Sequence, residues 1–184
     1  MSDPNGDVVA ALKSNGVRDV DNSSLTRALY SSDASLYRVV PEVVVRPRDI
    51  DEVQAVVSAC AETQTPLTAR GAGTSIAGNA IGTGVILDFS KHLNKVLAID
   101  ETTATAQVEP GVVHAKLQAA ATPVGLRYGP DPSTHTRCTV GGMIANNACG
   151  NRALGYGRSA DNIAALDVIR IGGERLQVGR DVSV

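Results

Sequence analysis

Glycine is concentrated in a few short stretches of this chain rather than spread along it. The sequence holds 18 glycines, and most of them lie in residues 71–84, in residues 141–157 and in the pair Gly172-Gly173. Glycine leaves backbone N–H groups uncovered and reaches backbone angles that other residues avoid. Such stretches indicate loops that approach a ligand with their backbone, so these loops are the candidate functional site.

Length and charge narrow the class of protein. The 184 residues make one large domain or two small ones, and 43% hydrophobic residues suffice for a buried core. A net charge of −2 without a Lys/Arg cluster gives no footprint for nucleic acid or for an anionic membrane. The start, Met1 to Asp7, is acidic where a signal peptide would be basic, and no long apolar run occurs. We expect a cytoplasmic protein that binds neither nucleic acid nor a membrane.

The cysteines and histidines favour neither a metal site nor a hydrolase. Cys60, Cys138 and Cys149 lie too far apart for a disulfide framework or a CxxC zinc site, and we expect them to be buried as small hydrophobic residues. The histidines show no metal-ligand spacing, and no nucleophile elbow occurs. We therefore predict no metal site.

Hydrophobic patterning predicts an α+β fold with two subdomains. Residues 1–40 are predicted to be a helical lead-in with helices near 8–13 and 24–30, the second capped by Ser23 or Ser24. Residues 41–100 are predicted to form a first subdomain with a small, mainly parallel sheet. Residues 101–184 are predicted to form a second subdomain with a more antiparallel sheet.

The patterns that carry this prediction are specific. In the first subdomain they are a β-branched strand at 43–45, a helix that Asp49 caps with apolar residues at spacings of three and four, and strands at 67–70 and 85–88. In the second they are a hairpin of 96–100 with 103–109, a helix over 112–121, and a hairpin of 167–171 with 175–178. Gly172-Gly173 is the expected two-residue loop of the last hairpin.

The first glycine-rich segment, residues 66–79, places a strand in front of a glycine loop. Consecutive uncovered N–H groups form a concave anion site, suited to a phosphate or a pyrophosphate. A dinucleotide fingerprint would need glycine where Ile76 stands, and the Gly-Lys-Ser/Thr of a P-loop is absent, so both motifs are excluded. A plain surface turn is the alternative for this loop taken alone.

The second segment, residues 128–150, combines prolines, hydroxyls, paired glycines and paired asparagines with few charges. Prolines fix a backbone wall, and Gly141-Gly142 would let a flat ring approach the main chain. Hydroxyls and amides supply directional hydrogen bonds without net charge. These properties fit a large planar cofactor with polar edges.

Several ordered motifs together resemble the PCMH-type FAD-binding domain of the vanillyl-alcohol oxidase superfamily. Within it the chain is most similar to the branch of D-lactate, glycolate and D-2-hydroxyglutarate dehydrogenases. The resemblance covers about Pro41 to the end. The motifs that carry it are Val43-Val-Val-Arg-Pro47, Arg70 to Asn79, Val85-Ile-Leu-Asp88, Val108-Glu-Pro-Gly111, Gly129-Pro-Asp-Pro-Ser133, Thr139 to Gly150, and Tyr156-Gly157.

The resemblance implies which residues bind FAD. Those expected to cradle the pyrophosphate are Arg70, Gly71, Ala72, Gly73, Thr74, Ser75, Gly78 and Asn79. Those expected to line the rest of the cofactor are Pro130, Asp131, Pro132, Ser133, Thr139, Gly141, Gly142, Ala145, Asn146, Asn147, Gly150, Tyr156 and Gly157. In several family members a histidine bonded covalently to the flavin stands where this chain has Thr74, so we expect non-covalent FAD.

The resemblance also implies an activity: oxidation of a D-2-hydroxy acid to the 2-oxo acid by hydride transfer to FAD. The catalytic base of this branch belongs to a substrate domain that the chain lacks, so we expect an N-terminal fragment that is inactive alone. An iron–sulfur cluster would require a further C-terminal domain. A sheet edge left unpaired by the truncation would favour a homodimer.

Two alternatives to this activity stay open. The chain could be a module that does not bind FAD productively, or part of a flavin enzyme of the same fold that acts on an unrelated alcohol, amine or sugar. Three further residues have side chains that could serve catalysis or substrate binding. His135 beside a flavin could act as a base, and Arg137 or Arg152 could attract a small carboxylate substrate or a phosphate. We expect all three to be surface residues.

Overall fold

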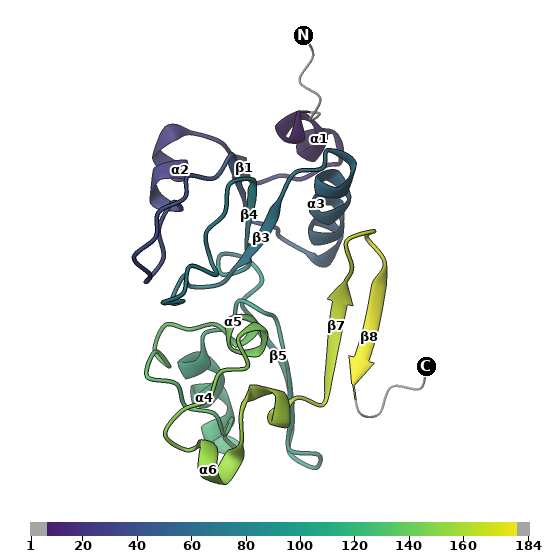
Figure 1. Ribbon diagram of the computed structural model, residues 1–184. Coiled ribbons are helices and arrows are strands. Elements are labelled where there is room, and N and C mark those ends of the chain that lie inside the picture. Colours follow the sequence, from purple (N-terminus) through teal and green to yellow (C-terminus); the bar gives the residue numbers. More distant parts are fainter. Residues whose placement is uncertain (1–6, 180–184) are drawn as a thin grey trace.

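A four-stranded sheet organises the first half of the chain (Figure 1). The computed structural model describes residues 7–179, so the acidic start, residues 1–6, lies outside the described residues, as does 180–184. The sheet order is β1-β2-β4-β3, with β1 antiparallel to β2 and the other pairs parallel. The strands are β1 (Val20–Asp21), β2 (Val43–Val45), β3 (Leu67–Arg70) and β4 (Val85–Asp88). The predicted mainly parallel sheet is confirmed.

Three helices accompany this sheet. Helix α3 (Ile50–Glu62) begins after Asp49, whose side chain accepts a hydrogen bond from the Glu52 backbone N–H at 2.9 Å as the sequence predicted. Its apolar stripe and the buried side of α1 (Val8–Ser14) join β2 and β4 in one core cluster. Helix α2 (Ser24–Leu29) is capped by Ser23. Both predicted lead-in helices are therefore present.

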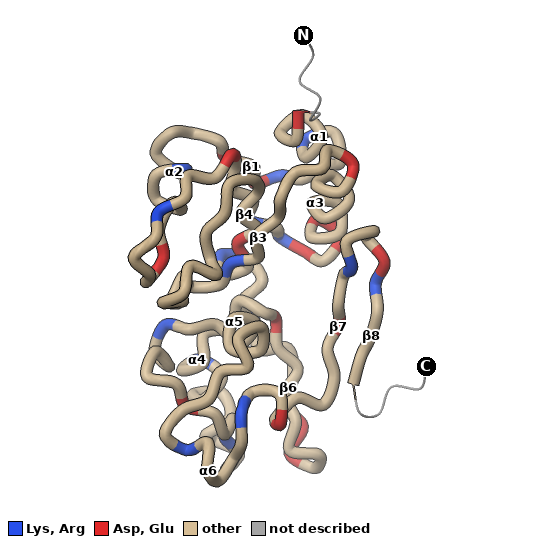
Figure 2. Tube along the Cα trace, in the orientation of Figure 1, with Lys and Arg blue, Asp and Glu red and all other residues tan. Residues whose placement is uncertain are grey.

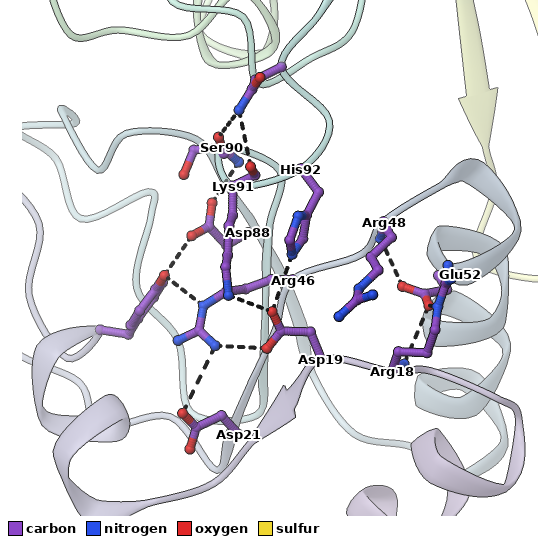
Figure 3. A network of polar contacts seen from close by, with 12 residues as sticks. Arg18, Asp19, Asp21, Arg46, Arg48, Glu52, Asp88, Ser90, Lys91 and His92 are labelled. Carbon is purple, nitrogen blue, oxygen red and sulfur yellow. Dashed lines mark hydrogen bonds and ion pairs between the residues drawn. The ribbon is translucent and has the colours of Figure 1, made fainter.

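A network of polar contacts joins the lead-in to the sheet (Figure 3). The Asp19 carboxylate pairs with Arg46 Nη1 at 3.0 Å and with Lys91 Nζ at 2.8 Å. Tyr30, which follows α2, donates from its hydroxyl to Asp88 Oδ2 at 2.6 Å. The lead-in also supplies β1, an edge strand that the sequence patterns did not predict. The lead-in and the sheet thus form one structural unit.

The second half contains two hairpins and several short helices. The elements are β5 (Val96–Asp100), β6 (Thr105–Val108), α4 (His114–Ala121), the 3₁₀ turn η1 (Thr122–Val124), α5 (Val140–Ala145), α6 (Ala153–Tyr156), the 3₁₀ turn η2 (Ser159–Asn162), β7 (Ala165–Ile169) and β8 (Arg175–Gly179). Each hairpin is an antiparallel two-stranded sheet. The α+β class and the antiparallel character of this half are confirmed, and the subdomain boundary near residue 100 stays a prediction.

The loop of the last hairpin differs from its prediction. The hairpin also contacts the first half of the chain. The Arg170 N–H donates to the Glu174 carbonyl at 2.9 Å, so the loop has three residues rather than two, with Gly173 at φ +79°. A three-residue loop of this kind needs a left-handed residue at its end, which glycine supplies. Gln54 Nε2 of α3 donates to the Gly173 carbonyl at 2.7 Å. The hairpin therefore lies against α3 (Figure 1).

Two helices depart from the sequence patterns. The helix predicted from Val112 begins at His114, because Val112 accepts a hydrogen bond from the Val140 N–H at 2.8 Å and Val113 bridges to Thr139. Helix α5 was not predicted, since its two glycines disfavour a helix by propensity. Tertiary contacts override that propensity.

The described residues test the predicted burial of the cysteines. Cys60 and Cys138 are buried, and burial raises the pKa of the Cys60 thiol to about 11, but Cys149 is exposed and its predicted burial is wrong. Cys149 lies in an irregular segment after α5 and its turn, which composition could not reveal. Lys and Arg positions are scattered among Asp and Glu positions along the trace (Figure 2). Within residues 7–179 no helix has the length and apolar character needed to cross a membrane.

Candidate functional site

The glycine loop, residues 71–79, leaves the carboxyl end of β3 with its backbone uncovered. Within the described chain, the N–H groups of Ala72, Gly73 and Thr74 have no protein acceptor. No residue from Gly71 to Asn79 is charged, and Figure 2 shows an uncharged turn after β3. Several free N–H groups on an uncharged loop form a site for an anion such as a phosphate.

The two glycine-rich segments meet. A Cβ added at Gly71 would lie 2.1 Å from Oγ1 of Thr139, which is buried and caps α5 by accepting from the Gly142 N–H at 3.3 Å. On the other side of the loop, Asn79 Nδ2 donates to Asn146 Oδ1 at 2.8 Å. The glycine loop and α5 therefore form one continuous surface, as a ligand shared by both segments would require.

The side chain of Arg70 holds the glycine loop closed. Its Nη1 donates to the Ala80 carbonyl at 2.9 Å and its Nη2 to the Ser32 carbonyl at 3.0 Å. The guanidinium also lies over the Tyr30 ring, 5.1 Å from its centroid. Two of the five N–H donors of Arg70 therefore shape the loop, and the expected contact of Arg70 with a pyrophosphate stays a prediction.

The second segment is folded tightly around Asp131. A Cβ at Gly150 would lie 2.3 Å from the Asp131 backbone carbonyl atoms. Arg152 donates to Asp131 from its backbone N–H at 2.9 Å and pairs through Nε at 3.2 Å. Arg152, considered for attracting a carboxylate substrate, is thus already paired. Gly129 lies against Tyr156, since a Cβ there would be 2.5 Å from Tyr156 Cβ.

The predicted residues differ in accessibility. Pro130 and Thr139 are buried, so their side chains support the site from behind. Glycine is required at position 141 by the fold itself, because a Cβ there would lie 2.8 Å from Pro110 Cβ and 2.9 Å from the Pro110 carbonyl oxygen. The predicted residues with exposed surface are Ala72, Asn79, Ser133, Ala145, Asn146, Asn147 and Tyr156, and those partly exposed are Arg70, Gly71, Gly73, Thr74, Ser75, Gly78, Asp131, Pro132, Gly141, Gly142, Gly150 and Gly157.

One buried histidine, His114, lies beside the second segment although no sequence pattern predicted a role for it there. His114 is 2% exposed, and its Nε2 lies 2.8 Å from the Pro130 carbonyl oxygen. Burial is the main cause that lowers the pKa of His114, so the ring is neutral near pH 7 and supports the Pro130 turn by donating to it. No spacing signal pointed to it. His135 and Arg137 are exposed, as expected.

Comparison with known proteins identifies a family and several relatives of this chain. A model of the FAD binding domain family matches residues 41–179. The glycolate oxidase subunit GlcD of Bacillus subtilis is 38% identical over 167 residues, which are 89% of this chain and 35% of that protein. The D-2-hydroxyglutarate dehydrogenase of Pseudomonas putida is 36% identical over 170 residues, 90% of this chain and 17% of that protein. The D-lactate dehydrogenase of Anaerostipes hadrus is 39% identical over 145 residues, 78% of this chain and 30% of that protein.

The fold also matches solved structures. A structure of alkyldihydroxyacetonephosphate synthase superposes with a TM-score of 0.82 over 96% of this chain and 35% of that chain, at 22% identity. This likeness shows the fold alone. The chain spans at most about a third of the length of the relatives it matches. Because the family match covers most of the chain and includes both glycine-rich segments, the protein belongs to the FAD binding domain family.

Proposed function

We propose that this chain binds FAD and forms the cofactor-binding part of an oxidoreductase. The observation that carries the proposal is the uncharged glycine loop, whose N–H groups at Ala72, Gly73 and Thr74 have no protein acceptor within the described residues. The start of this loop, Gly71, lies against Thr139, the cap of α5. These donors suit pyrophosphate oxygens. When bound, FAD would supply a ring that accepts a hydride.

The same proposal assigns the other predicted residues to positions along the cofactor. The amides of Asn79 and Asn146 bond each other at the junction of the two segments and are exposed, so they can turn toward a ligand. The turn at Asp131, with Ser133 exposed beside it, is held by Gly150 and Arg152. These groups bind and orient. No described residue is proposed as the catalytic base.

The substrate class is the further part of the proposal. The relatives named for glycolate, D-lactate and D-2-hydroxyglutarate share a 2-hydroxy acid as substrate, so we propose that the complete enzyme oxidises a D-2-hydroxy acid to a 2-oxo acid. The test uses the product of the complete gene, mixed without oxygen with each of the three acids. Loss of flavin colour with these acids but not with L-lactate supports the class, and loss with none of them contradicts it.

Binding of FAD is tested first with a charge in the glycine loop. Ala72→Glu places a carboxylate beside the free N–H groups, and we expect it to weaken FAD binding at least about tenfold through repulsion of the pyrophosphate. The measurement is a fluorescence titration of FAD. Ala10→Glu, at a position on α1 that is also exposed, is the control and should leave the affinity unchanged. Equal affinities for the two variants would mean that the loop does not hold the pyrophosphate.

The bond to the flavin is tested separately. The side chain of Thr74 has no ring nitrogen of the kind that bonds a flavin covalently, so acid precipitation of the FAD-loaded protein should leave the flavin in the supernatant. The absorption spectrum of both fractions measures this. Flavin that stays with the precipitated protein would contradict a non-covalent cofactor. A folded wild-type protein that takes up no FAD would instead favour the alternative of a module that does not bind the cofactor.

A further inference from the structure

Residues 31–39, the lead-in loop, form a closed structure outside the region that the family model matches. Ser32 and Arg38 form an antiparallel bridge, and the Val39 N–H donates to the Ser31 carbonyl at 2.8 Å. Asp33 Oδ1 accepts from a backbone N–H two residues later at 2.8 Å. The lead-in loop therefore has a fixed shape of its own. Its tip lies beside the glycine loop (Figure 1).

The lead-in loop fixes a peptide in the middle of the glycine loop. The Ala34 N–H donates to the Gly73 carbonyl at 3.0 Å. In a trans peptide the carbonyl and the following N–H point in opposite directions. Because the Gly73 carbonyl points at the lead-in loop, the Thr74 N–H points away from it. Glycine readily adopts other backbone angles, so without this bond the peptide would be free to turn over.

The lead-in loop also holds both ends of the glycine loop. The Ser32 carbonyl accepts from Arg70 Nη2 at 3.0 Å, just before the loop. Asp33 Oδ2 accepts from the Ala80 N–H at 3.3 Å, just after it. Arg70 Nη1 then donates to the Ala80 carbonyl at 2.9 Å, which closes the base of the loop. The lead-in loop thus forms hydrogen bonds to the middle of the glycine loop and to the residues directly before and after it.

We propose that the lead-in loop sets the affinity for FAD, with Asp33 and Ala34 acting as positioning residues that hold the glycine loop in its anion-binding shape. The proposal rests on the function proposed above. It assigns to residues outside the matched region a role in the same site. A preorganised loop binds more tightly, because it does not have to be ordered when the ligand arrives.

The test compares Asp33→Ala, Asp33→Asn and Asp100→Ala. Asp100 is the matched control, since its Oδ1 also accepts two backbone N–H groups, at 2.8 and 3.3 Å, but in the β5–β6 turn. We expect Asp33→Ala to weaken FAD binding about tenfold and Asp100→Ala less than about twofold. Asparagine keeps a carbonyl acceptor, so Asp33→Asn should recover part of the affinity. Urea unfolding should show no larger loss of stability for Asp33→Ala than for the control.

A second readout does not need FAD. Trypsin cleaves after Arg70 only if its guanidinium leaves the Ser32 and Ala80 carbonyls, so limited digestion should cut this bond several times faster in Asp33→Ala than in wild type. Ala34→Pro, which removes the donor to Gly73, should do the same. If wild type binds no FAD, the proposed function fails while this digestion still tests the lead-in loop. Equal cleavage in wild type, Asp33→Ala and Ala34→Pro, or equal FAD affinity of the two aspartate-to-alanine variants, would overturn the proposal.

Discussion

Gly150→Ala is expected to lower the free energy of unfolding by about 3 kcal/mol, the upper part of the range for forcing an extra carbon into a filled site. The new Cβ would lie 2.3 Å from the backbone carbonyl carbon and oxygen of Asp131 and 2.4 Å from its Oδ1. Backbone atoms cannot rotate away as a flexible side chain would. The turn at Asp131 would have to move, and we expect FAD binding to fall with it. Urea unfolding and an FAD titration measure the two effects.

Gly155→Ala is the matched control for this substitution. Gly155 lies in α6, five residues away, and a Cβ there meets no atom within 4 Å. Alanine in a helix is favoured over glycine by about 0.5–1 kcal/mol, so this variant should be as stable as wild type or slightly more. If Gly150→Ala proved as stable as Gly155→Ala, the close approach between Gly150 and Asp131 would be refuted.

Arg46→Met is expected to cost about 3 kcal/mol of stability. The Arg46 side chain is 13% exposed and pairs with Asp19, which is 16% exposed, at 3.0 Å. It also lies over the Tyr30 ring and donates to the Tyr30 hydroxyl at 3.3 Å. Methionine fills a similar volume but leaves a mostly buried carboxylate short of a partner, which costs about 3–5 kcal/mol when burial is complete. Thermal or urea unfolding measures the loss.

The exposed pair in the last hairpin provides the control for Arg46→Met. Arg170 and Glu174 pair at 3.2 Å with side chains 64% and 59% exposed, so Arg170→Met should cost at most about 1 kcal/mol. A loss for Arg46→Met no greater than for Arg170→Met would show that the network in Figure 3 adds little to stability.

The effect of Arg46 should depend on pH. Burial opposes ionisation of Asp19, but hydrogen bonds from Lys91, His92 and Arg46 outweigh it and hold the pKa of Asp19 below its usual value. A lowered pKa stabilises the folded protein fully above the ordinary value of about 4, and this stability is lost as the pH falls through the lower folded value. The difference between wild type and Arg46→Met should therefore shrink below about pH 4.

Local patterns predicted most of the elements because these elements depend on local causes. The β-branched residues of β2 favour a strand locally, and Asp49 caps the helix that directly follows it. Strands β3 and β4 begin and end where the sequence predicted. Helix α5 was missed because Gly141 is required by its close contact with Pro110, a residue 31 positions away that no local pattern contains.

The candidate site was predictable as a set of segments and not as a set of contacts. The glycine loop and the region around Asp131 could be recognised from composition and order alone. The bond of Arg70 to the Ser32 carbonyl, and that of the lead-in loop to Gly73, each join residues 30 to 40 positions apart in the chain. Turn-forming residues such as Asp33 predict a turn, but they do not reveal what the turn touches.

The contact of the last hairpin with α3 restricts hinge motion between the two halves of the chain. The two halves of the chain meet at Gly71 and Thr139, and again where Gln54 bonds Gly173 and where Arg175 pairs with Asp51 at 2.5 Å. Two separate attachments resist rotation that either one alone would permit. The glycine loop and α5 should therefore keep a fixed separation, and exchange of a ligand bound to both should be limited by local motion of loops rather than by opening of the whole molecule.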